Sequence, residues 1–188
     1  MKRTLFAGLG VGATVVAIVL AGCSADGATG VEPRLGAPVV MGAITRYEPL
    51  KRELTVTATI GSEGGSFGIP EAGLVVTVPA GAVSEPVTFS ATARRGSMVA
   101  YDFQPSGRFD VPLEVTQDLY YTSWHHQTDL TDVFAGYYTG EGALDDEQGE
   151  AEVSEVPEST VDVEKCKVTF EVHHFSGYVI ATGRNRRE

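Results

Sequence analysis

The feature that most constrains the fold is an alternation of apolar and polar residues that recurs in short segments. In Leu54–Ile60, apolar residues alternate with three threonines, and the same period of two returns in Leu74–Val78. Successive side chains of a strand point to opposite faces of a sheet, so this period predicts half-buried strands. Residues 79–82, Pro-Ala-Gly-Ala, end the second run with a turn.

About nine such segments follow one another at regular spacing, with turn residues between them. No segment after residue 23 has a convincing helical periodicity. We therefore predict an all-β fold, an antiparallel β-sandwich of about nine strands. Besides the two runs above, the predicted strands cover residues 87–91, 99–103, 109–115, 119–124, 133–139, 161–172 and 177–182.

The amino terminus has a different pattern. Lys2 and Arg3 precede an apolar run over residues 5–21, and small residues stand just before Cys23. A basic start, a short apolar core and a small-residue cleavage point are typical of a secretory signal. An uncleaved membrane anchor is the alternative, but a run of 17 residues with three glycines is at the lower limit for a spanning helix.

The residues Leu20-Ala21-Gly22-Cys23 resemble the Leu-Ala-Gly-Cys motif of bacterial lipoprotein signals. The resemblance implies removal of residues 1–22, attachment of diacylglycerol to Cys23 and acylation of the new amino terminus, with fatty acids such as palmitate. Two or three chains would hold the protein at the membrane, because each buried methylene contributes about 0.8 kcal/mol. The implied location is the bacterial cell membrane, lipid-anchored on the extracytoplasmic side.

The rest of the chain divides by composition. Residues 23–51 are predicted to be the lipid anchor and a flexible tether, because the first part is small, polar and Gly-rich. Residues 39–44 fit either the tether or a first strand. The sandwich is predicted over residues 52–183. A basic tail at 184–188 follows it, either solvated or in contact with lipid phosphate.

Residues 141–158 hold eight acidic residues and no basic ones. This composition predicts a solvated loop between two strands. Calcium binding is the less favoured alternative, because the Asp-x-Asp-x-Asp-Gly spacing of a calcium loop is absent.

Charge and cysteine content narrow the possible partners. The net charge is -11, and loss of Lys2 and Arg3 with the signal makes it more negative by two. Such a surface disfavours nucleic acid as a partner. If Cys23 carries lipid, Cys166 has no cysteine to pair with. Cys166, Val168 and Phe170 are spaced two residues apart, so in a strand their side chains would point to the same face. We therefore predict that Cys166 points into the core as a small hydrophobe.

Three segments share a further resemblance. Residues 64–83 combine a Gly-Gly turn with an alternating strand and Pro-Ala-Gly-Ala-Val, residues 101–115 contain Phe-Gln-Pro-Ser-Gly, and residues 172–179 read Val-His-His-Phe-Ser-Gly-Tyr-Val. Together they resemble the ZU-five domain, the β-sandwich module of zonula occludens proteins, netrin receptors and ankyrins, which bacterial surface proteins also contain. The resemblance covers about residues 54–183. It implies a non-catalytic interaction module without a cofactor, whose partner would be an envelope protein.

The same resemblance raises one chemical alternative, since some relatives with a second sandwich cut themselves between Phe and Ser of this motif. Here Ser176 would attack the carbonyl carbon of Phe175 to form an ester, which water would hydrolyse. His174 or His173 would move the proton. The reaction needs a strained peptide bond. We favour the structural alternative, in which Phe175 fills the core and His174 and Ser176 satisfy backbone groups, so no enzyme activity is predicted.

Two other clusters could bind ligands. The pairs His125-His126 and His173-His174 could meet across a sheet and bind zinc, but no third ligand is evident, and we predict no metal site.

Aromatic residues gather in neighbouring predicted strands, where outward-facing rings would form a platform for a sugar or a protein. The alternative is that half of them face the core. Rings clustered on one face would favour envelope carbohydrate binding. The aromatic residues are Tyr120, Tyr121, Trp124, Tyr137 and Tyr138.

Overall fold

The computed structural model of the protein describes residues 37–125 and 132–182. They form antiparallel strands and two short 3-10 helices, so the predicted all-β, antiparallel fold is confirmed, with thirteen strands rather than nine. The predictions for residues 1–22, Cys23, His126 and the tail at 184–188 lie outside the described residues. The elements are β1 (Val39–Ala43), β2 (Thr45–Leu50), β3 (Leu54–Ile60), β4 (Gly65–Ile69), η1 (Pro70–Ala72), β5 (Leu74–Val78), β6 (Val87–Ala93), β7 (Gly96–Met98), β8 (Ala100–Asp118), β9 (Val133–Tyr138), η2 (Glu141–Ala143), β10 (Leu144–Asp145), β11 (Glu150–Val153), β12 (Ser159–Asp162) and β13 (Lys167–Thr182).

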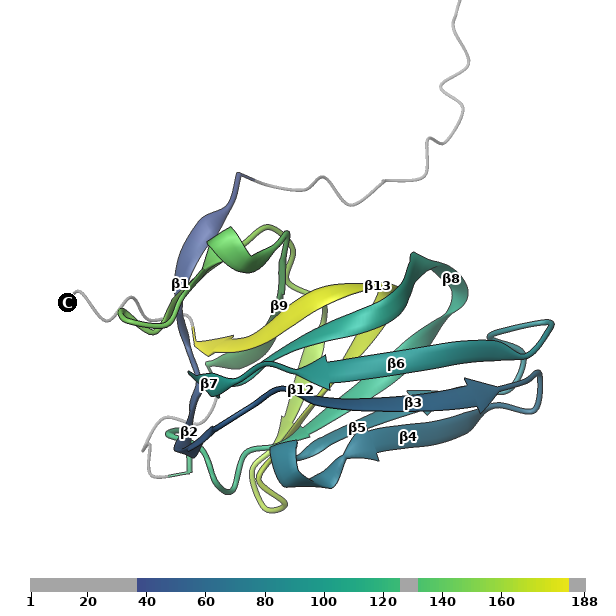
Figure 1. Ribbon diagram of the computed structural model, residues 1–188, viewed down its shortest axis with the longest axis horizontal. Helices are drawn as coiled ribbons and strands as arrows, with labels where there is room; N and C mark the ends of the chain where they lie inside the picture. Colours follow the sequence, from purple (N-terminus) through teal and green to yellow (C-terminus); the bar gives the residue numbers. More distant parts are fainter. Residues whose placement is uncertain (1–36, 126–131, 183–188) are drawn as a thin grey trace, which may run out of the picture. The chain divides into compact units, whose positions relative to one another are not determined.

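Two long strands, β8 and β13, run through both layers of the sandwich (Figure 1). Residues 113–118 of β8 pair with residues 167–172 of β13, and β4, β5 and β12 extend this layer. Residues 100–102 of β8 pair with residues 177–179 of β13, and β3, β6, β9 and β1 extend the other layer. A small sheet of β2 and β7 lies at one end. The two layers are therefore joined by continuous backbone.

The passage between layers is made by bulges. The register of β13 against β8 shifts between Val172 and His174, and again between Phe175 and Gly177. Bulges bend a strand and increase its twist, which is how a strand turns a corner from one sheet to the next. The motif that resembles the ZU-five domain thus forms the corner of the sandwich.

We predicted separate strands at 99–103 and 109–115, and this is wrong, because β8 runs without a break from Ala100 to Asp118, through Pro105 and Gly107. Proline lacks a backbone N–H and breaks a strand only where the ladder needs that donor. Pro105 and Pro112 both stand at positions of β8 that have no registered partner in β5, β6 or β13. The strand therefore tolerates them at the bend.

The core lies between the layers and is centred on aromatic rings. Phe175 is 2% exposed, and its ring centroid lies 5.0 Å from that of Phe103 and 5.7 Å from that of Phe89. Phe109 closes the cluster from the bend of β8, with its ring centroid 5.1 Å from that of Phe175. Three rings from two strands, β6 and β8, therefore pack around the corner residue, and Phe175 fills the core as expected.

A tether over all of residues 23–51 is contradicted, because β1 and β2 lie within that range. Strand β1 pairs with β11 and β13, and Ala43 and Ile44 are buried. Of the two alternatives for residues 39–44, the first strand is therefore the correct one. Pairing with distant strands, rather than local pattern, orders this segment.

The acidic segment 141–158 is also more ordered than the predicted solvated loop. It contains η2, β10 and β11, and β11 pairs with β1. Ala151 and Val153 are buried, and a Cβ on Gly136 would lie 2.6 Å from Val153 Cγ2. Burial of Ala151 and Val153 and the pairing of β11 with β1 stabilise this segment despite its charge.

Three further predictions, for residues 119–124, for residues 161–172 and for Cys166, differ from the structure. Residues 119–124 form turns rather than a strand, with Leu119, Thr122 and Trp124 buried. The predicted strand at 161–172 is interrupted by a turn at 163–166. Cys166 lies in that turn with a φ of 52° and is only partly buried against the core, so its predicted inward strand position is wrong. Val168 and Phe170 do point inward, as predicted.

The described residues contain no helix with the length and apolar character needed to cross a membrane.

Gly177 provides a test of the packing at the corner. A Cβ on this residue would lie 2.5 Å from ring atoms of Tyr138, whose hydroxyl is held by hydrogen bonds and whose ring cannot easily retreat. We expect Gly177→Ala to lower the free energy of unfolding by about 1–3 kcal/mol, as overpacking does. Urea denaturation measures the effect.

Gly107→Ala is the matched control, because Gly107 faces Phe175 across the same corner but has open space around its Cβ position. It should change stability much less. Equal losses from the two variants would contradict this account of the corner.

Candidate binding surfaces

The residues proposed for self-cleavage lie at the corner of β13, but in separate environments. Phe175 faces the core, His173 is exposed, and Ser176 is half-buried. His174 Nε2 lies 3.2 Å from Glu155 Oε2, and its carbonyl oxygen accepts a hydrogen bond of 3.0 Å from the hydroxyl of Tyr178. Burial, and secondarily Glu155, raises the pKa of Tyr178. The imidazole of His174 is therefore occupied by a carboxylate rather than by a backbone group.

The geometry of residues 173–177 does not favour cleavage of the Phe175–Ser176 bond. Within residues 173–177, all of them described, no φ is left-handed and no hydrogen bond joins Ser176 Oγ to either imidazole. Gly177 is required by the approach of the Tyr138 ring and not by an unusual backbone. Self-cleavage stays a prediction that only the resemblance raises.

We expect the purified protein to stay intact at the Phe175–Ser176 bond. Its intact mass, followed for days at neutral pH, should equal that of Ser176→Ala apart from the one oxygen atom by which serine exceeds alanine. A fragment that ends at Phe175, present in the parent and absent in the variant, would establish cleavage instead.

No metal site emerges from the described residues. Within them, no three His, Cys, Asp or Glu side chains lie close enough together to hold an ion. His125 packs against Tyr120, with 4.3 Å between ring centroids, and His174 pairs with Glu155. His126 belongs to the part of the chain that is not described.

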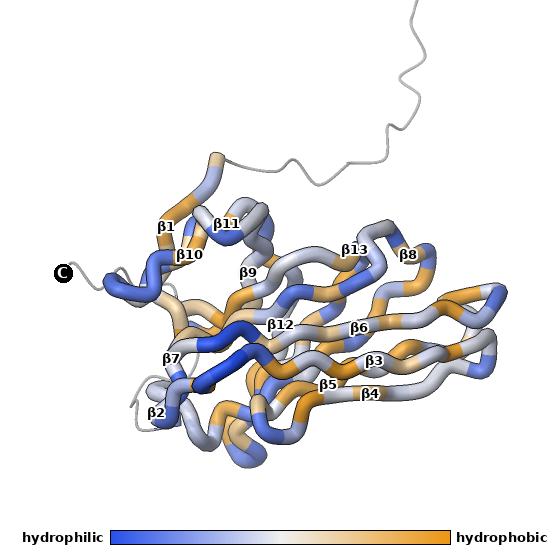
Figure 2. The backbone as a smooth tube through the Cα atoms, viewed as in Figure 1, coloured by the Kyte–Doolittle hydropathy of each residue, from blue (hydrophilic) through white to orange (hydrophobic). Residues whose placement is uncertain are grey.

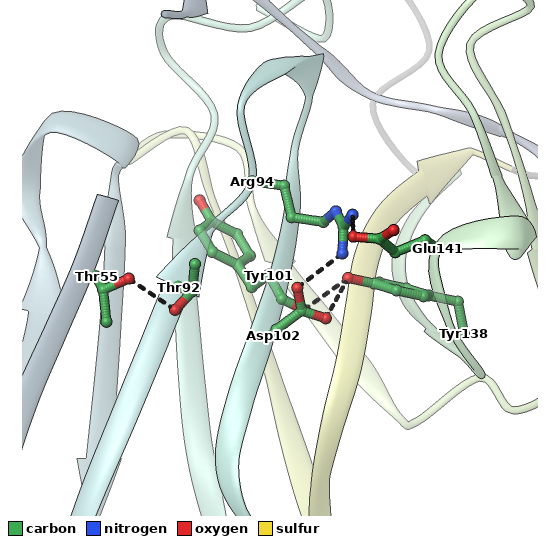
Figure 3. A network of polar contacts seen from close by, with 7 residues as sticks. All are labelled: Thr55, Thr92, Arg94, Tyr101, Asp102, Tyr138 and Glu141. Atoms are coloured by element: carbon green, nitrogen blue, oxygen red, sulfur yellow. Dashed lines mark hydrogen bonds and ion pairs between the residues drawn. The ribbon is translucent and has the colours of Figure 1, made fainter. Parts of the chain in front are cut away.

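Arg94, which directly follows β6, is at the centre of a polar cluster whose other members come from β8, β9 and η2 (Figure 3). Its guanidinium contacts Asp102 of β8 at 2.9 Å and Glu141 of η2 at 2.8 Å. Tyr138 Oη of β9 lies 2.8 Å from Asp102 Oδ1, and burial together with that carboxylate raises the pKa of Tyr138. The cluster fastens the acidic segment to the sandwich, and its members satisfy one another.

The predicted aromatic cluster divides between core and surface. Trp124 and Tyr138 are buried, whereas Tyr120 and Tyr121 are 50% and 75% exposed, with 5.0 Å between their ring centroids. Tyr47 of β2, which we had assigned to the tether, joins them: it is 48% exposed, and its backbone N–H donates to the carbonyl of Tyr121 at 3.1 Å. We call these three exposed residues the tyrosine cluster.

A hollow of about 560 Å³ opens beside the tyrosine cluster. It lies among β2, η1, the end of β8 and the turns that follow β8. Carboxylates reach it from three elements, as Glu48, Glu71 and Asp118. We call this hollow the tyrosine groove. Its lining is Arg46, Tyr47, Glu48, Pro70, Glu71, Ala72, Gly73, Gln117, Asp118, Tyr121 and Thr122.

The tyrosine groove rests on a buried polar network. Arg46 is 8% exposed, and its guanidinium donates to the carbonyl of Met98 and, at 3.3 Å, to the hydroxyl of Tyr101. Tyr101 donates in turn to Gln117, and Gln117 Nε2 donates to the carbonyl of Ala72 at 3.0 Å. Burial raises the pKa of Tyr101, although the nearby Arg46 opposes this. The network ties β2, η1 and β8 together under the groove.

One donor of this network has no partner. Arg46 Nε is buried and makes no hydrogen bond with any described residue, nor does any carboxylate in the described chain form an ion pair with Arg46. A buried guanidinium without a counter-charge is costly. Arg46 was not predicted as a site residue, because it falls within the predicted tether.

A second surface is the edge of β3 opposite β6, which forms no ladder within the described residues; β4 lies beside this edge (Figure 1). Within the described residues β3 pairs only with β6, and β4 only with β5. The seven residues of β3 include no charge and no proline, and Figure 2 shows no strongly hydrophilic segment between its ends. A groove of about 360 Å³ separates residues 52–56 from residues 68–71, between the two strands. On the outer face, Thr55 bonds Thr92 and Thr59 bonds Thr88.

No family of known proteins matches the sequence, and no curated protein matches it either.

Proposed function

We propose that the chain is a bacterial lipoprotein, anchored through lipid on Cys23 to the extracytoplasmic side of the cell membrane. Its β-sandwich, similar to a ZU-five domain, is a protein-interaction or scaffolding module of the envelope. The Leu-Ala-Gly-Cys sequence supports the anchor. The three segments at residues 64–83, 101–115 and 172–179 support the family resemblance.

The observation that carries the interaction role is the edge of β3 that forms no ladder and opens, along residues 52–56, into the groove beside β4. Unpaired edges can add a strand from a partner, with backbone hydrogen bonds giving affinity and alternate side chains giving specificity. Natural proteins usually protect a long edge with lysine, proline or a bulge. In β3 none of these is present over seven residues, and the ladder with β6 is regular from Leu54 to Ile60.

The lipid anchor predicts a clear fractionation result. Cells fed with labelled palmitate should incorporate label into the parent protein, which should sediment with membranes. Cys23→Ser should abolish labelling and release the protein from the membrane fraction, because the acyl chains supply the anchoring. Cys166→Ser is the matched control and should behave like the parent. A Cys23→Ser protein that fractionates as the parent does would refute the anchor.

The edge predicts where a protein partner binds. A photo-crosslinking residue in place of Thr57, exposed in the middle of β3, should capture one specific envelope protein on intact cells. The same residue in place of Glu171, exposed on the interior strand β13, should not.

A charged side chain on the edge should prevent strand addition. We expect Thr57→Lys to abolish co-purification of the captured protein, while Thr88→Lys on the interior strand β6 should retain it. Undiminished co-purification with Thr57→Lys would place the interface elsewhere.

A further inference from the structure

We propose that the tyrosine groove binds a neutral saccharide chain of the cell envelope. The access of the groove to such polymers rests on the extracytoplasmic location proposed above. The tyrosine groove adjoins the β3 groove at Pro70 and Glu71, but Tyr47 and Tyr121, which line it, do not belong to the β3 edge.

The exposed rings are the first argument. Tyr47 and Tyr121 line the groove from two elements, and Tyr120 packs edge-on against Tyr121. Phenol rings offer an apolar face with a polar tip, which suits a ligand that is itself apolar on one face and hydroxylated at its rim. Three adjacent tyrosines at 48%, 50% and 75% exposure also exceed the scattered apolar residues that a surface normally carries.

The charged residues that line the tyrosine groove indicate which class of ligand it can bind. Arg46 lies among the lining residues as a buried cation without an ion pair in the described chain, which disfavours a cationic ligand. Glu48, Glu71 and Asp118 disfavour an anionic one. A wholly apolar ligand would leave these polar groups desolvated without partners, which is costly.

A neutral saccharide avoids each of these penalties. Its hydroxyl groups both donate and accept, so they can donate to the carboxylates of Glu48, Glu71 and Asp118 and accept from donors in the lining. The faces of its rings present C–H groups to Tyr47 and Tyr121. The volume of about 560 Å³ falls within the range of about 300–1,000 Å³ typical of ligand sites.

The groove is also held in place before any ligand arrives. The bonds from Arg46 to Tyr101, from Tyr101 to Gln117 and from Gln117 to Ala72 fix its floor. A fixed floor spares a ligand the entropic cost of ordering the site, which matters for a ligand that binds weakly per contact.

The test uses the full chain in detergent micelles and three neutral tetrasaccharides, those of β-1,4-linked glucose, β-1,4-linked N-acetylglucosamine and α-linked mannose. Saturation-transfer NMR and calorimetry at millimolar sugar should detect binding of at least one. Tyr47→Ala and Tyr121→Ala should each weaken that binding about tenfold, because each removes one ring face. Both residues are exposed, and the fluorescence of buried Trp124 reports whether the variants remain folded.

Val163→Ala is the matched control, since Val163 is 46% exposed and lies in the turn before β13, outside the groove. It should bind sugar as the parent does. The proposal is overturned if none of the three sugars binds, or if the tyrosine variants bind as tightly as the parent. Neither result touches the palmitate labelling or the β3 crosslink, so this proposal and the lipoprotein function fail separately.

Discussion

The pairing of β8 with β13 is the interaction on which the rest of the structure depends. Each layer of the sandwich contains part of this one ladder, so the layers are joined by backbone as well as by packing. The ladder must bend, and it does so at the bulges around Phe175, where three rings from β6 and β8 surround the corner. A motif that could be interpreted as catalytic therefore has a sufficient structural explanation: its phenylalanine fills the corner and its glycine admits the ring of Tyr138.

Local pattern predicted those strands whose side chains alternate between core and solvent. Leu54–Ile60 and Leu74–Val78 match β3 and β5 in full, because each is half-buried and ends at a turn. Local pattern did not predict the strands that are stabilised mainly by pairing or packing with residues distant in the sequence. Strand β11 forms in a highly acidic segment because Ala151 and Val153 pack inward, and β4 is too rich in glycine to signal a strand.

The groove could be predicted only in part, for a related reason. Tyr120 and Tyr121 were recognised as possible outward-facing rings, but the turn that presents them was expected to be a strand. Tyr47 and Arg46 belong to the segment expected to be a tether. The network under the groove joins Arg46, Tyr101 and Gln117, whose separations of 55 and 16 residues leave no pattern for local reasoning to detect.

The same long strand links the corner to the groove. Tyr101 lies in the first half of β8, where it pairs with Tyr178 of β13, and Gln117 lies near the strand's other end. Their side chains nevertheless meet, because the bend brings the two halves of β8 face to face across the core. The floor of the groove is therefore a consequence of the corner: a straight β8 would hold these two residues about 50 Å apart, at roughly 3.3 Å per residue. Packing around Phe175 thus determines both the fold and the position of a hollow that combines exposed aromatic rings with a buried guanidinium that has no ion pair among the described residues.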